Sequence, residues 1–277
     1  MYKVTKYPHG TFSWAENTST DARAAEAFYL ALFGWDKFDI PISESMTYTM
    51  FQTQGELVCA LNPMMPEIQA QGIPSFWGNY VTVADVDALV APIKANGGTI
   101  LVEPMDVFDS GRMTFIVDPT GAQLGLWQPN NHIGAGIVNT VGAMCWNELL
   151  TRDIETAKAF YAKLFGWEYR VDEHYTHISN GGRGNGGMME MDENFGEMPP
   201  MWMVYFHVSD IDAAMKRVET LGGKVITQKM EAPATGWFTV VEDPAGAPFY
   251  IMQLEQAEPW QEEPGSAKDE SVSDAAR

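Results

Sequence analysis

The sequence has few basic residues and few cysteines. Of its 277 residues, 17 are Lys or Arg and 37 are Asp or Glu, which gives a formal net charge of -20. Nucleic-acid binding needs clustered Lys and Arg, so this balance argues against a nucleic-acid partner. Only Cys59 and Cys145 are present. We therefore expect no disulfide framework and a reducing, cytoplasmic location.

Membrane and secretion signals are also missing. No apolar run approaches the length that a membrane-spanning helix needs, so no membrane partner is expected. The N-terminal residues MYKVTKYPHG lack the apolar stretch of a secretory signal. The motifs GxxxxGK[ST], HExxH and GxSxG do not occur, which argues against P-loop, zincin and α/β-hydrolase chemistry.

What the sequence does contain is an internal repeat. Residues 11–35 read TFSWAENTSTDARAAEAFYLALFGW, and residues 143–167 read AMCWNELLTRDIETAKAFYAKLFGW. Later in each half, ADVDA is matched by SDIDA, and DPTGA is matched by DPAGA. A repeat of this kind predicts two similar modules and identifies positions that are equivalent in space.

Each half is predicted to contain two β-α-β-β-β units, which makes the fold α+β. In each half a short strand precedes a helix with the core-spaced pair Phe28–Tyr29 or Phe160–Tyr161, and Gly34 or Gly166 ends that helix. Asp85 and Asp210 are predicted to cap the second helix of each half. The glycine-rich segment 181–187 is predicted to be a loop or β-turn.

The predicted domain organisation follows from the repeat and from local composition. Module 1 is placed at residues 10–128 and module 2 at 142–254, with a Gly- and Asn-rich linker at 129–141 between them. Residues 255–277 are acidic and poor in core-forming side chains, so we predict a disordered tail.

These motifs resemble a known family. The run WxExxTxDxxxAxxFYxxLFGW and the later DVDA, GG and DPxG elements are similar to the vicinal oxygen chelate superfamily, in its tandem two-module branch. That superfamily includes glyoxalase I, extradiol dioxygenases, fosfomycin-resistance enzymes and bleomycin-binding proteins. The resemblance implies paired β-α-β-β-β units whose mixed sheets curl into cups. In metal-using members, His and Glu on the first and last strands of a unit hold a divalent ion.

The resemblance also implies where metal ligands should lie in this chain. The six positions are occupied by Trp14, Gly78, Gly125, Trp146, Met203 and Tyr250. None of these residues carries an imidazole or a carboxylate. We therefore predict cups without a metal or another cofactor.

The predicted lining of the cups follows from strand alternation, because residues two apart share a face. Glu16 should lie beside Trp14, and Glu148 beside Trp146. The other predicted lining residues are mostly aromatic or Met, as is usual for small-molecule pockets: Tyr80, Thr82, Trp127, Met203, Tyr205, His207, Tyr250 and Met252.

Glu16 and Glu148 are the main candidates for function, because the WxE motif occurs in both halves. A carboxylate in an aromatic cup is suited to acid–base catalysis or to pairing with a ligand cation, with Trp14 or Trp146 adding cation–π contact. The alternative is a structural carboxylate held by backbone N–H groups or an arginine. His207 is a further acid–base candidate or a structural hydrogen-bonding residue.

Two other histidines have ligand-like spacing. His174 and His177 lie three apart on one predicted strand, so they should point to opposite faces and are not expected to share a metal.

Three functions remain open. We favour a glyoxalase/bleomycin-resistance-like protein that binds a small cationic or aromatic molecule in a metal-free cup. The second is a lyase, isomerase or dioxygenase that acts on a small oxygenated substrate, with Glu16, Glu148 or His207 as acid–base groups or unconventional ligands. The third is a scaffold whose own Trp and Met side chains fill the cups. A monomer of two modules or a homodimer is expected.

Overall fold

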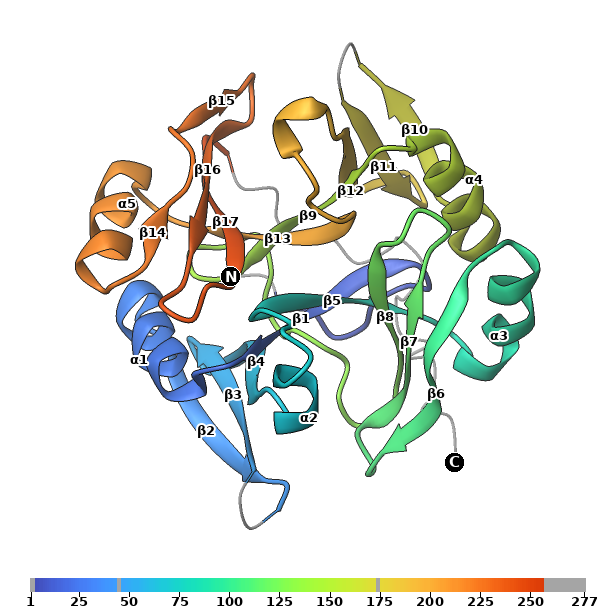
Figure 1. The fold of residues 1–277 in the computed structure, drawn as a ribbon, viewed down its shortest axis with the longest axis horizontal. Helices are drawn as coiled ribbons and strands as arrows, with labels where there is room; N and C mark the ends of the chain where they lie inside the picture. The colour runs from blue at the N-terminus through green and yellow to red at the C-terminus, as the bar shows by residue number, and fades with distance from the viewer. Residues whose placement is uncertain (1–2, 44–45, 173–174, 257–277) are drawn as a thin grey trace, which may run out of the picture.

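The computed structural model describes residues 3–43, 46–172 and 175–256, which form two mixed β-sheets with helices packed on them (Figure 1). The first half contains β1 (Thr11–Ser19), α1 (Ala22–Phe33), β2 (Asp36–Pro41), β3 (Thr47–Thr53), β4 (Glu56–Pro63), α2 (Pro66–Gln69), β5 (Phe76–Thr82), α3 (Val86–Ala95), β6 (Thr99–Val107), β7 (Gly111–Val117) and β8 (Gln123–Pro129). The second half contains β9 (Met144–Thr151), α4 (Ile154–Phe165), β10 (Glu168–Val171), β11 (Thr176–Asn180), β12 (Arg183–Glu190), the 3-10 helix η1 (Glu193–Phe195), β13 (Met201–His207), α5 (Ile211–Thr220), β14 (Lys224–Val225), β15 (Met230–Ala232), β16 (Gly236–Glu242) and β17 (Pro248–Leu254).

Each sheet joins two units through their first strands. Sheet A has the order β2-β3-β4-β1-β5-β8-β7-β6, and sheet B has the order β10-β11-β12-β9-β13-β17-β16-β14, with β15 paired to β16. The central pairs β1–β5 and β9–β13 are antiparallel, whereas β1–β4 and β5–β8 are parallel. The predicted α+β fold of four β-α-β-β-β units is confirmed.

Local signals placed the helices correctly. Asp85 and Asp210 accept hydrogen bonds from the backbone N–H groups of Ala88 and Ala213, so both are N-caps as predicted. Gly34 and Gly166 adopt left-handed conformations, with φ of 69° and 72°, and end α1 and α4. No helix within the described ranges is long and apolar enough to cross a membrane.

Two strand predictions needed correction. The sequence pattern indicated strands at Tyr48–Thr53 and 57–61 after α1, and at Tyr175–Ser179 and 187–190 after α4, so it left out the edge strands β2 and β10. The reason is that β2, for example, is exposed at every position and shows no buried alternation. The segment 181–187 is not a loop throughout, since β12 begins at Arg183. Glycine is required at Gly187, where a Cβ atom would lie 2.0 Å from the Tyr175 hydroxyl.

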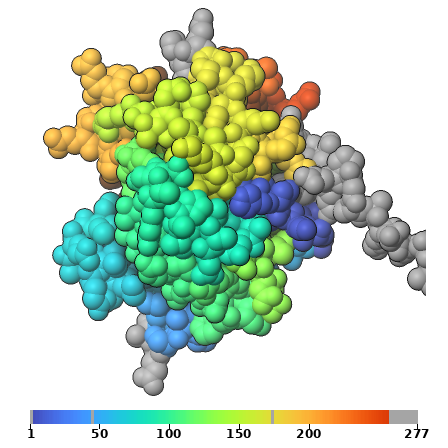
Figure 2. All heavy atoms as spheres, turned by 90° about the vertical axis from the view of Figure 1, so that its right-hand side faces the viewer, coloured from blue at the N-terminus to red at the C-terminus, as the bar shows by residue number. Residues whose placement is uncertain are grey.

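The two halves share their hydrophobic cores. One cluster joins Phe28 and Tyr29 of α1 to Phe249 of β17, and the other joins Ile93 of α3 to Phe160 of α4. Figure 1 accordingly shows α1 beside α5 and α3 beside α4, and Figure 2 shows the face where α3 and α4 meet. The predicted packing of the Phe–Tyr pairs is confirmed, and their partners come from both halves.

The residues just before β1 and just before β9 are each held by a tryptophan of the opposite half. Trp167 Nε1 donates to the Gly10 carbonyl at 2.6 Å, and Trp35 Nε1 donates to the Gly142 carbonyl at 2.7 Å. Figure 2 shows the N-terminal residues lying against the second half. The predicted disordered tail falls largely on residues 257–277, which lie outside the described residues.

Candidate functional site

The concave face of sheet A, called cup A, is built around Glu16 on β1. Tyr48 Oη donates to Glu16 Oε2 at 2.5 Å, and Asn62 Nδ2 donates to Oε1 at 2.6 Å. Tyr80 forms a third hydrogen bond to this carboxylate. Burial raises the pKa of Glu16 to about 6, against the lowering effect of the three hydrogen bonds.

The concave face of sheet B, called cup B, repeats this arrangement around Glu148 on β9. Tyr205 Oη donates to Glu148 Oε1 at 3.0 Å, and Tyr175 and Tyr250 also hydrogen-bond to the carboxylate. Glu148 is 3% exposed, and burial raises its pKa above the ordinary value. The structure therefore brings Glu148 together with two tyrosines that the sequence had assigned to the cup, Tyr205 and Tyr250.

A tryptophan orients one tyrosine in each cup. Trp146 Nε1 donates to Tyr175 Oη at 2.8 Å, and Trp14 hydrogen-bonds to Tyr48 in the same way. The repeated WxE motif is thus part of a Trp–Tyr–Glu network. Sequence reasoning missed Tyr48 and Tyr175, although a signal existed, because both are followed by Thr at equivalent positions of the two halves.

The alternative prediction, that backbone N–H groups or an arginine hold the two carboxylates, is wrong about the partners. The partners of Glu16 and Glu148 are phenols and one amide, rather than backbone N–H groups or an arginine. Among the described residues, neither carboxylate forms an ion pair. Each cup therefore holds an acid, half-buried at Glu16 and buried at Glu148, that has hydrogen bonds but no cationic partner among the described residues.

Aromatic rings fill much of both cups. In cup A, His132 of the linker packs edge-on against Trp14 and Trp127, with ring centroids 4.7 and 5.8 Å apart, and Trp127 Nε1 donates to the His132 carbonyl. Burial lowers the pKa of His132 to about 4. In cup B, Tyr205 and Tyr250 stack in parallel with centroids 4.0 Å apart. Sequence reasoning did not single out His132, since no local pattern links it to cup A.

The other histidine candidates lie apart from the carboxylates. His207 is 7% exposed, and its Nδ1 donates to the Met252 carbonyl at 3.0 Å. It makes no hydrogen bond to Glu148 in the described part of the chain. His177 hydrogen-bonds to Asp172, and His174 lies outside the described residues. His207 therefore fits the structural role considered for it.

The residues at the implied metal positions do not fit a divalent ion. At Gly125 a Cβ atom would lie 2.4 Å from the Tyr80 ring, so this ring occupies the space of any side chain there. In cup B the implied positions include Met203 and Tyr250, and Tyr250 is held by its stack on Tyr205. The described ranges contain no group of three His, Cys, Asp or Glu side chains arranged to hold a metal.

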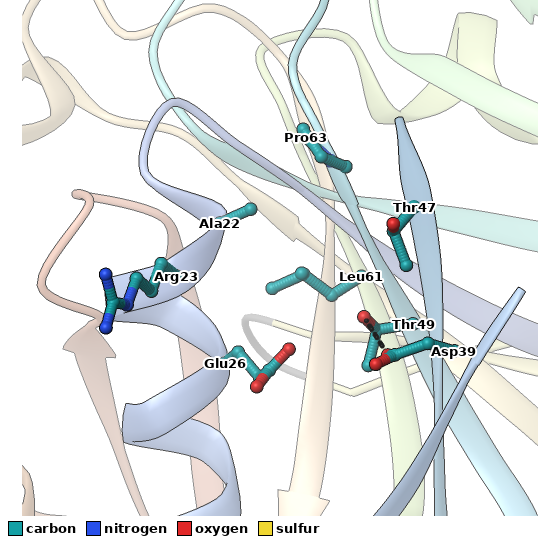
Figure 3. A pocket seen from close by; sticks show the side chains of 8 residues that line it. All are labelled: Ala22, Arg23, Glu26, Asp39, Thr47, Thr49, Leu61 and Pro63. Carbon is teal, nitrogen blue, oxygen red and sulfur yellow. Dashed lines mark hydrogen bonds between the residues drawn. The ribbon is translucent and has the colours of Figure 1, made fainter. Parts of the chain in front are cut away.

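Two surface hollows lie outside the cups, and the first is lined by residues of the first half. It has a volume of about 260 Å³ and lies between α1 and strands β2, β3 and β4 (Figure 3). Its lining residues are Ala22, Arg23, Glu26, Asp39, Thr47, Thr49, Leu61 and Pro63. A second hollow of about 30 Å³ is lined by Pro8, Thr11, Asn180, Gly181 and Arg183. Neither hollow reaches the Glu16 or Glu148 network.

Comparison of the two halves with known families gives a match for each. Residues 12–126 match the family model "Glyoxalase/Bleomycin resistance protein/Dioxygenase superfamily", and residues 144–252 match the model "Glyoxalase-like domain".

Full-length relatives share this organisation. The chain is 40% identical over 265 residues to "Putative glyoxylase CFP32" of Mycobacterium tuberculosis, covering 91% of this chain and 98% of the relative. It is 32% identical over 272 residues to "Anthracycline biosynthesis protein DauV" of a Streptomyces species, covering 92% and 98%.

Solved structures agree in fold at low sequence identity. The Mn(II)-bound glyoxalase from Novosphingobium aromaticivorans aligns with a TM-score of 0.61 at 14% identity, covering 94% of this chain and 87% of that one. The 2,3-dioxygenase LapB from Pseudomonas sp. KL28 aligns with a TM-score of 0.62 at 13% identity, covering 91% and 97%. With two matching domains in tandem and relatives above 30% identity along nearly the whole chain, this protein belongs to the glyoxalase/bleomycin resistance/dioxygenase superfamily as a two-module member.

Proposed function

We propose that this protein binds a small aromatic molecule that carries a positive charge, and that it does so without a metal ion. The observation that carries the proposal is the carboxylate in each cup, half-buried at Glu16 and buried at Glu148, which has phenol partners but no cation among the described residues. A buried charge without a counter-ion is costly, so a cationic ligand would gain a strong partner there.

The surroundings of the carboxylates favour the aromatic part of such a ligand. Trp14 and Trp127 face cup A, and Tyr205, Tyr250 and Phe238 lie together in cup B. Ring faces attract cations and stack on planar molecules. The relative DauV is named an anthracycline biosynthesis protein, and anthracyclines are polycyclic aromatic compounds, which supports an aromatic ligand.

The metal-dependent chemistry of structural neighbours does not carry over. The Novosphingobium glyoxalase is described as Mn(II)-bound, but this chain shares only its fold with that protein. Here the implied ligand positions hold Gly125 against the Tyr80 ring and Tyr250 against the Tyr205 ring. For this reason we assign the cup a binding role that depends on carboxylate and ring contacts.

A second function is favoured by one observation, the pKa of Glu16. At about 6, this pKa lies close to neutral pH, where a carboxyl group both accepts and donates protons readily. Tyr48 and Tyr80 are positioned to share hydrogen bonds with a substrate oxygen next to that carboxyl. The corresponding activity is that of a lyase or isomerase acting on a small oxygenated substrate by proton transfer.

A thermal-shift screen tests the binding proposal. The panel contains planar aromatic cations such as proflavine, aromatic anions such as naphthalene sulfonate, and the non-aromatic cation tetramethylammonium. We expect stabilisation by the aromatic cations alone, and loss of at least about tenfold in affinity in at least one of the variants Glu16→Gln and Glu148→Gln, because a charge-assisted contact is removed. Equal binding of the hits by wild type and both variants would overturn the proposal.

A further inference from the structure

The two cups are covered by different segments of the chain. Cup A is covered by the linker, whose His132 ring packs against Trp14. The linker is also hydrogen-bonded into sheet A, since the backbone N–H groups of His132 and Ala135 donate to the carbonyls of Ser110 and Ser13 at 3.0 and 2.8 Å. The linker over cup A is therefore part of the fold, and opening cup A would break the hydrogen bonds that hold the linker on sheet A.

Cup B is covered by a shorter segment, residues 191–200, which we call the cover loop. It connects β12 to β13, and its Phe195 and Met198 pack against the apolar cluster of cup B. The equivalent loop of the first half, residues 64–75, behaves differently. Met64 at its start and Ser75 at its end are buried, but Met65 is 50% exposed, and none of its described residues packs against the apolar cluster that contains Trp14 and Trp127. Packing of loop side chains on the cup cluster therefore distinguishes cup B.

Arg152 attaches the cover loop to the end of β9. Its Nη1 donates to the Met198 carbonyl at 2.8 Å, and its Nη2 donates to the Gly196 carbonyl at 2.6 Å. Arg152 is itself exposed. The equivalent residue of the first half is Thr20, which hydrogen-bonds to Ser75 and reaches no loop carbonyl in the described chain. Both loops are thus attached at this point, by a guanidinium on two carbonyls in the middle of the loop in the second half, and by Thr20 on the Ser75 hydroxyl at the end of the loop in the first.

The wall beneath the cover loop is made of methionine. Met203 and Met252 are buried in the cup B cluster, and Met189 and Met201 pack against it; Met191, the first residue of the cover loop, is buried in the same cluster. Methionine is unbranched and changes rotamer easily, so this wall can reshape around a ligand without moving the sheet. Cup A is lined instead by the rigid rings of Trp14 and Trp127 around His132.

We propose that the ligand enters cup B alone, and that entry requires the cover loop to separate from Arg152. Arg152 acts as a positioning residue that sets how often cup B opens. The chemistry of the ligand, a planar aromatic cation that reaches Glu148, rests on the proposed function above. Glu16 then organises Tyr48 and Tyr80 within a cup that the linker keeps closed.

Methionine oxidation tests the opening of cup B without any ligand. Wild type, Arg152→Ala and the matched first-half variant Thr20→Ala are exposed to hydrogen peroxide, and oxidation of each methionine is followed by mass spectrometry. In Arg152→Ala we expect Met203 and Met252 to oxidise about tenfold faster, because local opening no longer breaks two charge-assisted hydrogen bonds. Met50, buried in sheet A, should keep its wild-type rate in both variants.

Two outcomes of that experiment overturn the proposal. Unchanged rates at Met203 and Met252 in Arg152→Ala show that the anchor does not control access. Equal acceleration at Met50 shows a general loosening of the fold instead of opening at cup B.

Proflavine binding followed by stopped-flow fluorescence tests which cup takes the ligand. We expect Arg152→Ala to raise the association rate about tenfold, and Glu148→Gln to weaken binding about tenfold more than Glu16→Gln does. Weakening by Glu16→Gln but not by Glu148→Gln would place the ligand in cup A and overturn the proposal. If proflavine binds neither cup while the oxidation pattern holds, the proposed function is wrong and control of cup B by Arg152 stands.

Discussion

Tyr29 in the first helix donates a hydrogen bond of 2.9 Å to Asp243 Oδ2, although the two residues lie 214 positions apart in the sequence. The second half contains the equivalent contact, in which Tyr161 donates a hydrogen bond of 2.8 Å to Asp118 Oδ2 of the first half. Trp77 Nε1 donates in turn to the Tyr29 hydroxyl at 2.9 Å. The Tyr of each FYxxLFGW motif is thus satisfied by the DPxG aspartate of the opposite half, which couples the two modules into one folding unit.

Replacing this tyrosine should destabilise the whole protein. Tyr29→Phe leaves the Asp243 carboxyl and the Trp77 indole with one buried partner fewer, so we expect a loss of about 1–3 kcal/mol in the free energy of unfolding. Tyr161→Phe should cost a similar amount. The measurement is urea denaturation followed by Trp fluorescence.

Tyr169→Phe is the matched control, because Tyr169 is partly buried and its hydroxyl donates only to the Lys158 carbonyl within one half. We expect it to cost less than either cross-module variant. A loss in Tyr29→Phe no larger than in this control would contradict the coupling.

Glu16 should make stability depend on pH in the mildly acidic range. Its pKa is about 6 in the folded protein against an ordinary value of 4.5, so the folded state binds more protons between these values. Stability therefore falls as pH rises from 4.5 to 6, by about 2 kcal/mol from this group. Glu16→Gln should show a flatter profile in urea titrations across this window. Parallel profiles for the variant and wild type would mean that the pKa is not shifted.

His132 should act in the opposite direction. Burial lowers its pKa from 6.5 to about 4, so the unfolded chain takes up a proton before the folded protein does. Acidification from pH 6.5 to 4 therefore removes stability, by about 3 kcal/mol at most because the ring is partly exposed. His132→Phe keeps a ring against Trp14 and removes the titration. We expect this variant to lose less stability than wild type over that range; an equal loss would refute the assignment.

Gly125 should tolerate no side chain. A Cβ atom there would lie 2.4 Å from the Tyr80 ring, so Gly125→Ala must displace that ring and should cost about 1–3 kcal/mol in unfolding free energy. Gly184→Ala is the control, since its nearest neighbour is the Trp146 ring at 3.6 Å. The measurement is chemical denaturation of both variants. Equal losses of unfolding free energy in the two would contradict the close contact between position 125 and the Tyr80 ring.

Metal removal should leave the protein unchanged. Protein purified without chelators is predicted to contain no stoichiometric Zn, Ni, Fe or Mn, because Gly125 and Tyr250 offer no ligand at the implied positions. Treatment with EDTA should alter neither the melting temperature nor proflavine binding. Elemental analysis by mass spectrometry makes the check, and near-stoichiometric metal would refute the metal-free assignment.

Much of the fold was predictable because its signals are local. Asp85 and Asp210 cap helices through their own next turn, and Gly34 ends α1 because only glycine adopts its φ of 69° without strain. The edge strand β2 was missed because its exposed residues carry no burial pattern. Tyr48 was missed as a partner of Glu16 because it lies on another strand, 32 residues away.

The sequence by itself determined the duplicated architecture through its repeated motifs, and its resemblance to the superfamily implied the cups and the positions where metal ligands are replaced. It also pointed to Glu16 and Glu148. Only the tertiary structure decided that tyrosines hold these carboxylates, that the linker covers one cup and the Arg152-anchored loop the other, and that each half completes the core of its partner. The physical reason is range: caps and alternation act within a few residues, whereas burial, ring packing and cross-module hydrogen bonds depend on which distant segments meet.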